Sequence, residues 1–223
     1  MVTATVTRAR REPLTRQRVL SAALGYLDEN GLAELSMHKL GAQLGVSGMS
    51  LYNHVADKDA LLDGIVELLW DELAAAQPAS GDWRQILREL GLSLRLLAHR
   101  HPRAVTLLLT RPVLSVPMLR VYQRALQAMA DGGLPQPRAL EVLRTVVGYT
   151  FGYALTELSA LCATAGETQL QRMRRVSRMI SDDLPDDLLE VAMTVCGECD
   201  MAGHFATGLD LILSGPEPGP GRG

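Results

Sequence analysis

The sequence has few cysteines, no long apolar run and no pattern typical of an export signal. Three cysteines are an odd number in a chain of 223 residues, so we expect reduced thiols and no disulfide framework. No uninterrupted run of about 18 apolar residues occurs, so no membrane span is expected. Three arginines near the N-terminus precede no apolar segment, so we expect no secretory signal and a cytoplasmic protein.

Patterns typical of catalysis are also missing. We find no glycine-rich phosphate loop, no Ser-His-Asp order and no suggestive pair of carboxylates. Cys196 and Cys199 have the C-x-x-C spacing and His204 follows, but Cys162 is the only other thiol, so a metal or redox site lacks a convincing fourth ligand. We expect no enzyme and no cofactor, and interpret the two cysteines as small core residues; a redox or metal role for them stays open.

The chain does contain 47% apolar residues, and leucine, alanine, arginine and glutamate are abundant, a balance that favours helices. We therefore predict an all-α fold with two unequal domains. The net charge is −3, yet residues 1–18 carry five arginines and one acid. Because the rest of the chain is acidic, only the N-terminal end suits a polyanion; a solvated basic tail is the alternative interpretation.

Capping residues and apolar spacing predict the helices of the first 76 residues. They are expected between Thr15 and Gly31, between Ser36 and Gly45, from about Ser47 to His54, and from Asp57 to about Ala76. The turn-rich sequence QPASGD, residues 77–82, then separates a larger helical part.

In that larger part, helices are expected at 83–99, 118–130, 137–161, 169–183, 186–196 and 198–213, with a shorter helix among the prolines after residue 101. Residues 137–161 are apolar on much of their circumference, which predicts burial on two sides of that helix. The glycine- and proline-rich end of the chain is predicted to be disordered.

Residues 40–51 have the order of side chains that a helix-turn-helix requires. The first helix needs a small residue where the second crosses it, the turn needs a residue of positive φ, and the second helix needs an inward aliphatic side chain. Gly41, Gly45 and Leu51 take these places. The other side chains of the second helix should project outward, towards the major groove of DNA. An αα-hairpin without a DNA partner is the alternative.

The outward residues suit two kinds of DNA contact. Serine and asparagine hydrogen-bond to base edges and methionine contacts a thymine methyl group, whereas tyrosine, histidine and lysine are better placed against phosphates. The residues expected to contact DNA are Gly48, Met49, Ser50, Tyr52, Asn53, His54 and Lys58.

The run ALGYLDENGLAELSMHKLGAQLGVSGMSLYNHVADKDALLDGI, residues 23–65, resembles the N-terminal pattern of the tetracycline-repressor (TetR) family of transcriptional regulators. Two later segments, LLAHRHPRAVTLLLTRP and FATGLDLILSG, resemble the tetracycline-repressor branch. The resemblance implies a three-helix DNA-binding domain at 1–60, with 1–13 as a disordered arm. A connector helix at 57–76 would join it to a ligand-binding and dimerisation domain at 61–215, before a disordered tail at 216–223.

The resemblance also implies DNA contacts by His38 and Lys39. His38 and Gly48 fill places where tetracycline repressors have an arginine and a glutamine that read bases, so we expect a different operator. Leu107 stands where those repressors have a magnesium-binding histidine, so a tetracycline–magnesium complex is disfavoured.

We predict instead an apolar or aromatic small-molecule effector, oriented by few polar groups. The residues expected to bind it are Leu90, Leu94, Leu107, Leu108, Thr110, Gln123, Tyr149, Tyr153 and Glu157. Ordinary core packing is the alternative for each leucine.

One short recognition helix buries too little surface for tight specific binding, so two are needed, about 34–36 Å apart. We therefore expect a homodimer, with the helix 137–161 and the last helix forming a four-helix interface. The predicted function is a repressor that binds a palindromic double-stranded DNA operator and is released when an effector shifts the connector helix. A small-molecule carrier that does not bind DNA and a helical enzyme are the alternatives.

Overall fold

The computed structural model describes residues 13–78, 80–158 and 200–214, together with six single residues between 171 and 191. Every regular element in these ranges is a helix, which confirms the predicted all-α fold. The described residues form two compact units. The first comprises 13–70 and 103–115, and the second comprises 71–102 and the described residues from 116 onward. The predicted domain limits stay predictions.

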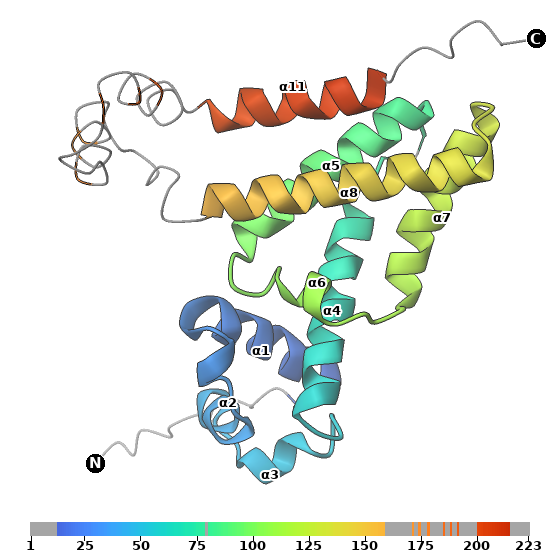
Figure 1. The fold of residues 1–223 in the computed structure, drawn as a ribbon. Coiled ribbons are helices and arrows are strands. Elements are labelled where there is room, and N and C mark those ends of the chain that lie inside the picture. Colours follow the sequence, from blue (N-terminus) through green and yellow to red (C-terminus); the bar gives the residue numbers. More distant parts are fainter. Residues whose placement is uncertain are drawn as a thin grey trace, which may run out of the picture. The chain divides into compact units, whose positions relative to one another are not determined.

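The first unit contains α1 (Arg16–Asn30), a 3-10 turn (Leu32–Glu34), α2 (Met37–Leu44), α3 (Gly48–Leu51), the start of α4 (Lys58–Ala75) and α6 (Leu107–Thr110) (Figure 1). The hydroxyls of Thr15 and Ser36 accept hydrogen bonds from backbone N–H groups three residues on, so both residues cap their helices as predicted. The fully buried core side chains of this unit include Val19, Ala23, Leu27, Leu40, Leu51, Leu61, Ile65 and Leu69.

The third helix is shorter than the sequence predicts, because α3 ends at Leu51 rather than at His54. The N–H groups of His54 and Val55 both donate to the Leu51 carbonyl, at 2.9 and 3.1 Å, so the chain turns there. Val55 is buried, and Asp57 then caps α4 by accepting from the N–H of Ala60 at 2.7 Å. The prediction was wrong because packing of Val55 and the start of α4 end the helix early.

The second unit contains the end of α4 from residue 71, α5 (Trp83–Arg100), α7 (Val116–Asp131), α8 (Gln136–Leu158) and α11 (Met201–Ser214). Helix α8 packs against α5, α7 and α11, and α11 also packs against α5 (Figure 1). The predicted boundaries of α5 agree within one residue, whereas α7 begins two residues early. Pro117 lies in the first turn of α7, where no backbone N–H is needed.

Within the described chain α8 is buried on one side and not on two. The buried positions are Ala139, Leu143, Val146, Thr150, Phe151 and Ala154. The opposite side carries Thr145, Gly148, Gly152 and Leu155, all exposed. No described element covers this face, so the expectation of burial on two sides stays a prediction.

Several expectations lie outside the described residues: the N-terminal arm and the C-terminal tail, most of the helices expected at 169–196, and Cys162, Cys196 and Cys199. Among the helices that the structure describes, none has the length and apolarity needed to cross a membrane.

Candidate DNA-binding and ligand-binding sites

Two glycines bring α2 and α3 into backbone contact. A Cβ atom at Gly41 would lie 2.8 Å from the backbone nitrogen of Gly48, and a Cβ at Gly48 would lie 3.1 Å from the Met37 carbonyl oxygen. Between the helices Gly45 adopts the left-handed conformation, with φ 69° and ψ 31°, and the N–H of Val46 donates to the Gly41 carbonyl at 2.9 Å. These contacts define a helix-turn-helix and explain why residue 48 has no side chain.

The nine residues predicted to contact DNA all lie outside the core. Leu51 is the inward anchor of α3, whereas Met49 is 75% exposed and Tyr52 is 44% exposed. Four more of the nine are exposed: His38, Lys39, Asn53 and Lys58. The other three are half-buried: Gly48, Ser50 and His54. All nine stay predicted DNA contacts. An exposed methionine beside an exposed tyrosine on so short a helix suits a partner surface better than water.

Lys39 is already paired within the unit. Its ammonium group forms an ion pair with the Glu34 carboxylate. The hydrogen bond that Lys39 donates to Glu34 raises the pKa of Lys39, so the lysine stays charged. On contact with DNA, a phosphate group would replace the Glu34 carboxylate as the anionic partner of Lys39.

The segment Arg103–Ser115 belongs to the same unit as the helix-turn-helix. Arg103 donates to the carbonyl oxygens of Asp28 and Glu29 at the end of α1. Arg111 donates from Nε to Asp63 at 2.8 Å and from Nη1 to Asp59 at 3.1 Å, both residues of α4. These hydrogen bonds raise the pKa of Arg111, and the bond that Arg111 donates to Asp63 has the largest effect. Both guanidinium groups therefore hold α6 and its flanking residues in the first unit.

The residues predicted to bind an effector are distributed over both units. Three of them, Leu107, Leu108 and Thr110, lie on α6 in the first unit. Leu107 is buried, Leu108 is half-buried and Thr110 is exposed. Leu90 and Leu94 are core residues of α5 in the second unit. The remaining four also belong to the second unit, on α7 and α8.

Two of these four, Tyr149 and Tyr153, fasten α8 to α11. Tyr149 stacks on the fully buried Phe205, with 5.4 Å between ring centroids, and its hydroxyl donates to the Phe205 carbonyl at 3.1 Å. Burial, and secondarily the charge of Glu157, raises the pKa of Tyr149. Tyr153 lies against the same phenyl ring, and its hydroxyl contacts the sulfur of Met201 at 3.7 Å. Both rings therefore serve the α8–α11 packing.

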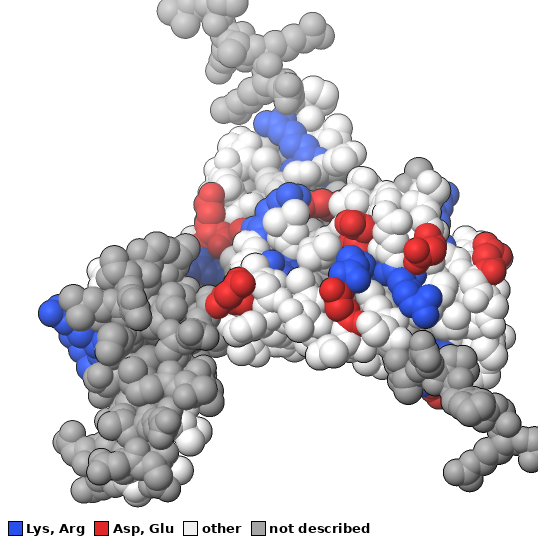
Figure 2. Space-filling model, turned by 90° about the horizontal axis from the view of Figure 1, so that it is seen from above, with Lys and Arg blue, Asp and Glu red and all other residues white. Residues whose placement is uncertain are grey.

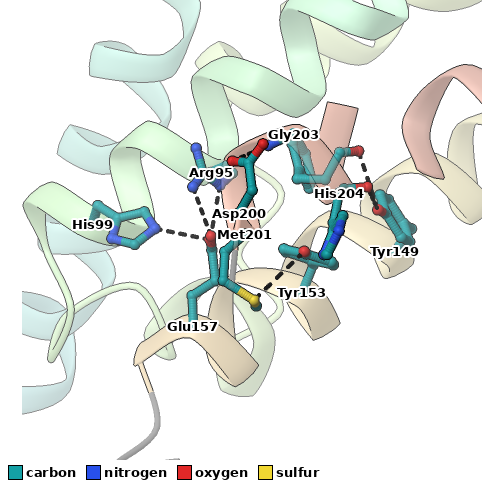
Figure 3. A network of polar contacts seen from close by, with 10 residues as sticks. Arg95, His99, Tyr149, Tyr153, Glu157, Asp200, Met201, Gly203 and His204 are labelled. Atoms are coloured by element: carbon teal, nitrogen blue, oxygen red, sulfur yellow. Dashed lines mark hydrogen bonds and ion pairs between the residues drawn. The ribbon is translucent and has the colours of Figure 1, made fainter. Parts of the chain in front are cut away.

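Glu157 is satisfied by two side chains of α5. Its carboxylate accepts hydrogen bonds from Nε and Nη2 of Arg95, at 2.8 and 2.6 Å, and from Nε2 of His99 at 2.9 Å (Figure 3). The Glu157 side chain is only 4% exposed, and its hydrogen bonds raise the pKa of Arg95. A carboxylate held by three donors has little capacity left for a ligand.

A groove with a volume of about 900 Å³ lies within the second unit. Its walls are the end of α4, the link to α5, the first turn of α5 and one side of α7. Of the nine predicted effector contacts, only Gln123 lines it. A second groove of about 680 Å³, between α7 and the start of α8, also includes Gln123. The polar stripe of α7, at residues 120, 123, 124, 127 and 131, was the sequence signal for the larger groove.

Charge is mixed on the face of the molecule that Figure 2 shows. Figure 2 shows basic and acidic side chains interspersed on a mostly uncharged face, so this face offers no patch of one sign to a polyanion. Among the residues that the structure describes, no group of three His, Cys, Asp or Glu side chains is arranged to hold a metal ion.

An all-helical fold with an N-terminal helix-turn-helix is typical of DNA-binding transcriptional regulators. Residues 75–218 match the family model described as the tetracyclin repressor-like C-terminal domain. The chain belongs to the tetracycline-repressor family, as its N-terminal motif predicts.

Individual relatives agree with this assignment. The chain is 30% identical over 213 residues to the HTH-type transcriptional repressor DrrR1 of Streptomyces coeruleorubidus, covering 92% of this chain and 77% of DrrR1. It is also 30% identical over 208 residues to the class D tetracycline repressor protein of Escherichia coli, covering 92% and 89%. The crystal structure of ActR from Streptomyces coelicolor in complex with actinorhodin has a TM-score of 0.71 and 27% identity, covering 92% and 97%.

Proposed function

We propose that this chain is a homodimeric repressor that binds a palindromic operator in the cytoplasm and releases it when a small molecule occupies the second unit. The helix-turn-helix carries this proposal. Backbone contact between Gly41 and Gly48 braces α3 from behind, so that Met49 and Tyr52 project into solvent. The short helix then has the support on one side and the free surface on the other that entry into a major groove requires.

The open face of α8 supports the dimer. A Cβ atom at Gly148 or Gly152 would meet no other described atom within 4 Å, and neighbouring Leu155 is exposed. On α11, Leu211 is 72% exposed. Small residues allow a second helix to approach closely, and the exposed leucines supply apolar area to bury. Pairing these two helices with their copies gives a four-helix interface of the kind common in symmetric dimers.

The way the chain connects the two units supports regulation by an effector. The chain crosses from one unit to the other three times: within α4 after Trp70, then after Pro102, and again after Ser115. Because Arg103 and Arg111 hold the segment between the last two crossings to α1 and α4, a shift of α5 or α7 on ligand binding would pull on the DNA-binding unit. A coupling of about 1–3 kcal/mol would weaken operator binding roughly 5- to 150-fold.

The names of relatives support repression and control by a small molecule. DrrR1 and the class D protein are named repressors, and ActR has been crystallised with actinorhodin. A groove of about 900 Å³ falls in the range of small-molecule sites. The effector is therefore a small apolar or aromatic molecule, bound in the second unit.

Selection of bound duplexes from a random pool tests the proposal. We expect a palindromic winner whose half-sites lie about one helical turn apart, with affinity that falls steeply as salt rises. A protein that only carries small molecules would enrich no sequence and would show no salt-dependent affinity for duplex DNA. Either of these results would exclude the repressor function.

A further inference from the structure

The groove of the second unit is electrically asymmetric along α7. Arg120 and Arg124 lie one turn apart towards one end of its lining, and Asp131 lies at the other end. Arg120 and Asp131 are eleven positions apart in the α-helix, which corresponds to about 16 Å along the axis. The groove therefore has a cationic end and an acidic end.

The acidic groups of the groove are already engaged. Asp82 caps α5, because its Oδ1 atom accepts from the N–H groups of Arg84 and Gln85 at 2.8 and 3.0 Å. The Oδ1 atom of Asp131 accepts from the Gln127 side-chain amide at 2.8 Å. One oxygen atom of each carboxylate is therefore already used within the protein.

The two arginines of the groove differ in whether they already have a partner within the protein. Arg124 donates from Nη1 to the carbonyl oxygen of Pro78 at 2.7 Å, which ties it to the link between α4 and α5. Arg120 forms no ion pair with any acidic side chain in the part of the chain that the structure describes. Its planar guanidinium group is therefore free for an anion, and its fork geometry matches a carboxylate with two parallel hydrogen bonds.

An aromatic ring is fixed in the same groove. A Cβ atom at Gly132 would lie 2.4 Å from Cδ1 of Trp83, so only glycine at 132 lets the indole lie against the end of α7. The guanidinium carbon of Arg84 lies 4.3 Å from the ring centroid, a cation–π contact that steadies the indole from one face. With Ile86 and Val121, Trp83 gives the groove an apolar wall suited to flat rings.

We propose that this groove binds a flat aromatic molecule carrying an anionic group, with its anion on Arg120 and its rings along the apolar wall that extends from Val121 towards Trp83. The binding site stands on the groove alone, whereas its regulatory meaning rests on the proposed function. The volume of about 900 Å³ accommodates three fused rings with room for substituents. A neutral ligand of the same shape would bind more weakly, because it leaves the guanidinium group of Arg120 without an anion.

The test uses two matched probes, anthracene-2-carboxylate and anthracene-2-carboxamide, with the full-length protein. The chain has two tryptophans. In a Trp70→Phe background Trp83 is the single emitter, so quenching of its fluorescence reports binding at the groove. We expect the carboxylate to bind at least tenfold more tightly than the carboxamide. Arg120→Gln should abolish that preference and leave carboxamide affinity within about twofold.

Arg138→Gln is the matched control, because Arg138 is exposed at the start of α8 and does not line the groove. It should preserve the preference for the carboxylate. Equal binding of the two probes, no effect of Arg120→Gln, or no quenching by either probe would overturn the inference.

A parallel titration of the operator complex separates this inference from the proposed function. If the carboxylate binds through Arg120 and the operator stays bound, the site is correct and effector control through it is wrong. If an effector releases the operator equally well from the Arg120→Gln protein, the regulator stands and the anion site is wrong.

Discussion

Substituting Gly41 by alanine should disrupt the DNA-binding unit out of proportion to the single methyl group added. The new Cβ would lie 2.8 Å from the nitrogen and 3.0 Å from the Cα of Gly48, and 3.0 Å from the carbonyl carbon of Ser47. Ordinary contact begins at 3.4 Å, so α3 must move away from α2 by about 0.6 Å. All three atoms belong to the backbone, so no side-chain rotation can relieve the clash.

Overpacking of this kind costs about 1–3 kcal/mol. In a chain of this length that loss corresponds to a fall in melting temperature of roughly 2–12 °C. Because the shift moves α3 itself, operator affinity should fall further than the loss of stability explains. Differential scanning calorimetry and fluorescence anisotropy with a labelled operator measure the two effects at a temperature where the variant is folded.

Gly25→Ala is the matched control. Gly25 lies inside α1, and a Cβ there would meet nothing within 4 Å. Replacing an exposed helical glycine by alanine should stabilise the protein by about 0.5–1 kcal/mol and leave operator affinity unchanged. If both alanine variants melt and bind DNA alike, the backbone contact between α2 and α3 does not support the recognition helix, and the reasoning fails.

Three further predictions concern the dimer, the phosphate contacts and the coupling. Gly152→Arg should give a folded monomer in analytical ultracentrifugation, because an arginine fits on the open α8 face of the single chain but blocks a second copy from packing there. The control variant Gly25→Arg should stay dimeric. A dimeric Gly152→Arg protein would place the interface elsewhere. Glu34→Gln should tighten operator binding about two- to fivefold in anisotropy titrations, because it frees Lys39; weaker binding would show that Glu34 supports the site. Arg111→Gln should preserve operator binding but make effector-induced release up to about fivefold smaller, since it removes two ion pairs; unchanged release would exclude this route.

The positions where helices begin and end could be predicted because they depend on neighbours in the chain. A hydroxyl at Thr15 or Ser36 satisfies an N–H group three residues away, and Gly45 adopts a positive φ at little cost. The order of Gly41, Gly45 and Leu51 predicted the helix-turn-helix for the same reason, since its three members lie within eleven residues.

The early end of α3 and the role of Gly48 were not predictable from such local signals. Burial of Val55 shortens α3, and Gly48 lies against the Met37 carbonyl rather than simply facing outward. Both features depend on how α2, α3 and α4 pack.

The residues of the ligand site could not be predicted either, because their contacts join segments that are far apart in sequence. Glu157 was expected to orient a ligand, yet Arg95, 62 residues away in sequence, occupies its carboxylate. The groove forms where the end of α4, the start of α5 and α7 come together; its α7 residues follow a helical period, but the residues from α4, the link and α5 do not continue that pattern.

The sequence by itself determined the helical class, the helix caps and the DNA-binding motif, because these follow from interactions within one or two turns of helix. The tertiary structure decided which polar groups are already paired, where the groove lies and which face of α8 stays open. Those properties depend on contacts between distant segments, and the spacing of residues along the chain does not contain them.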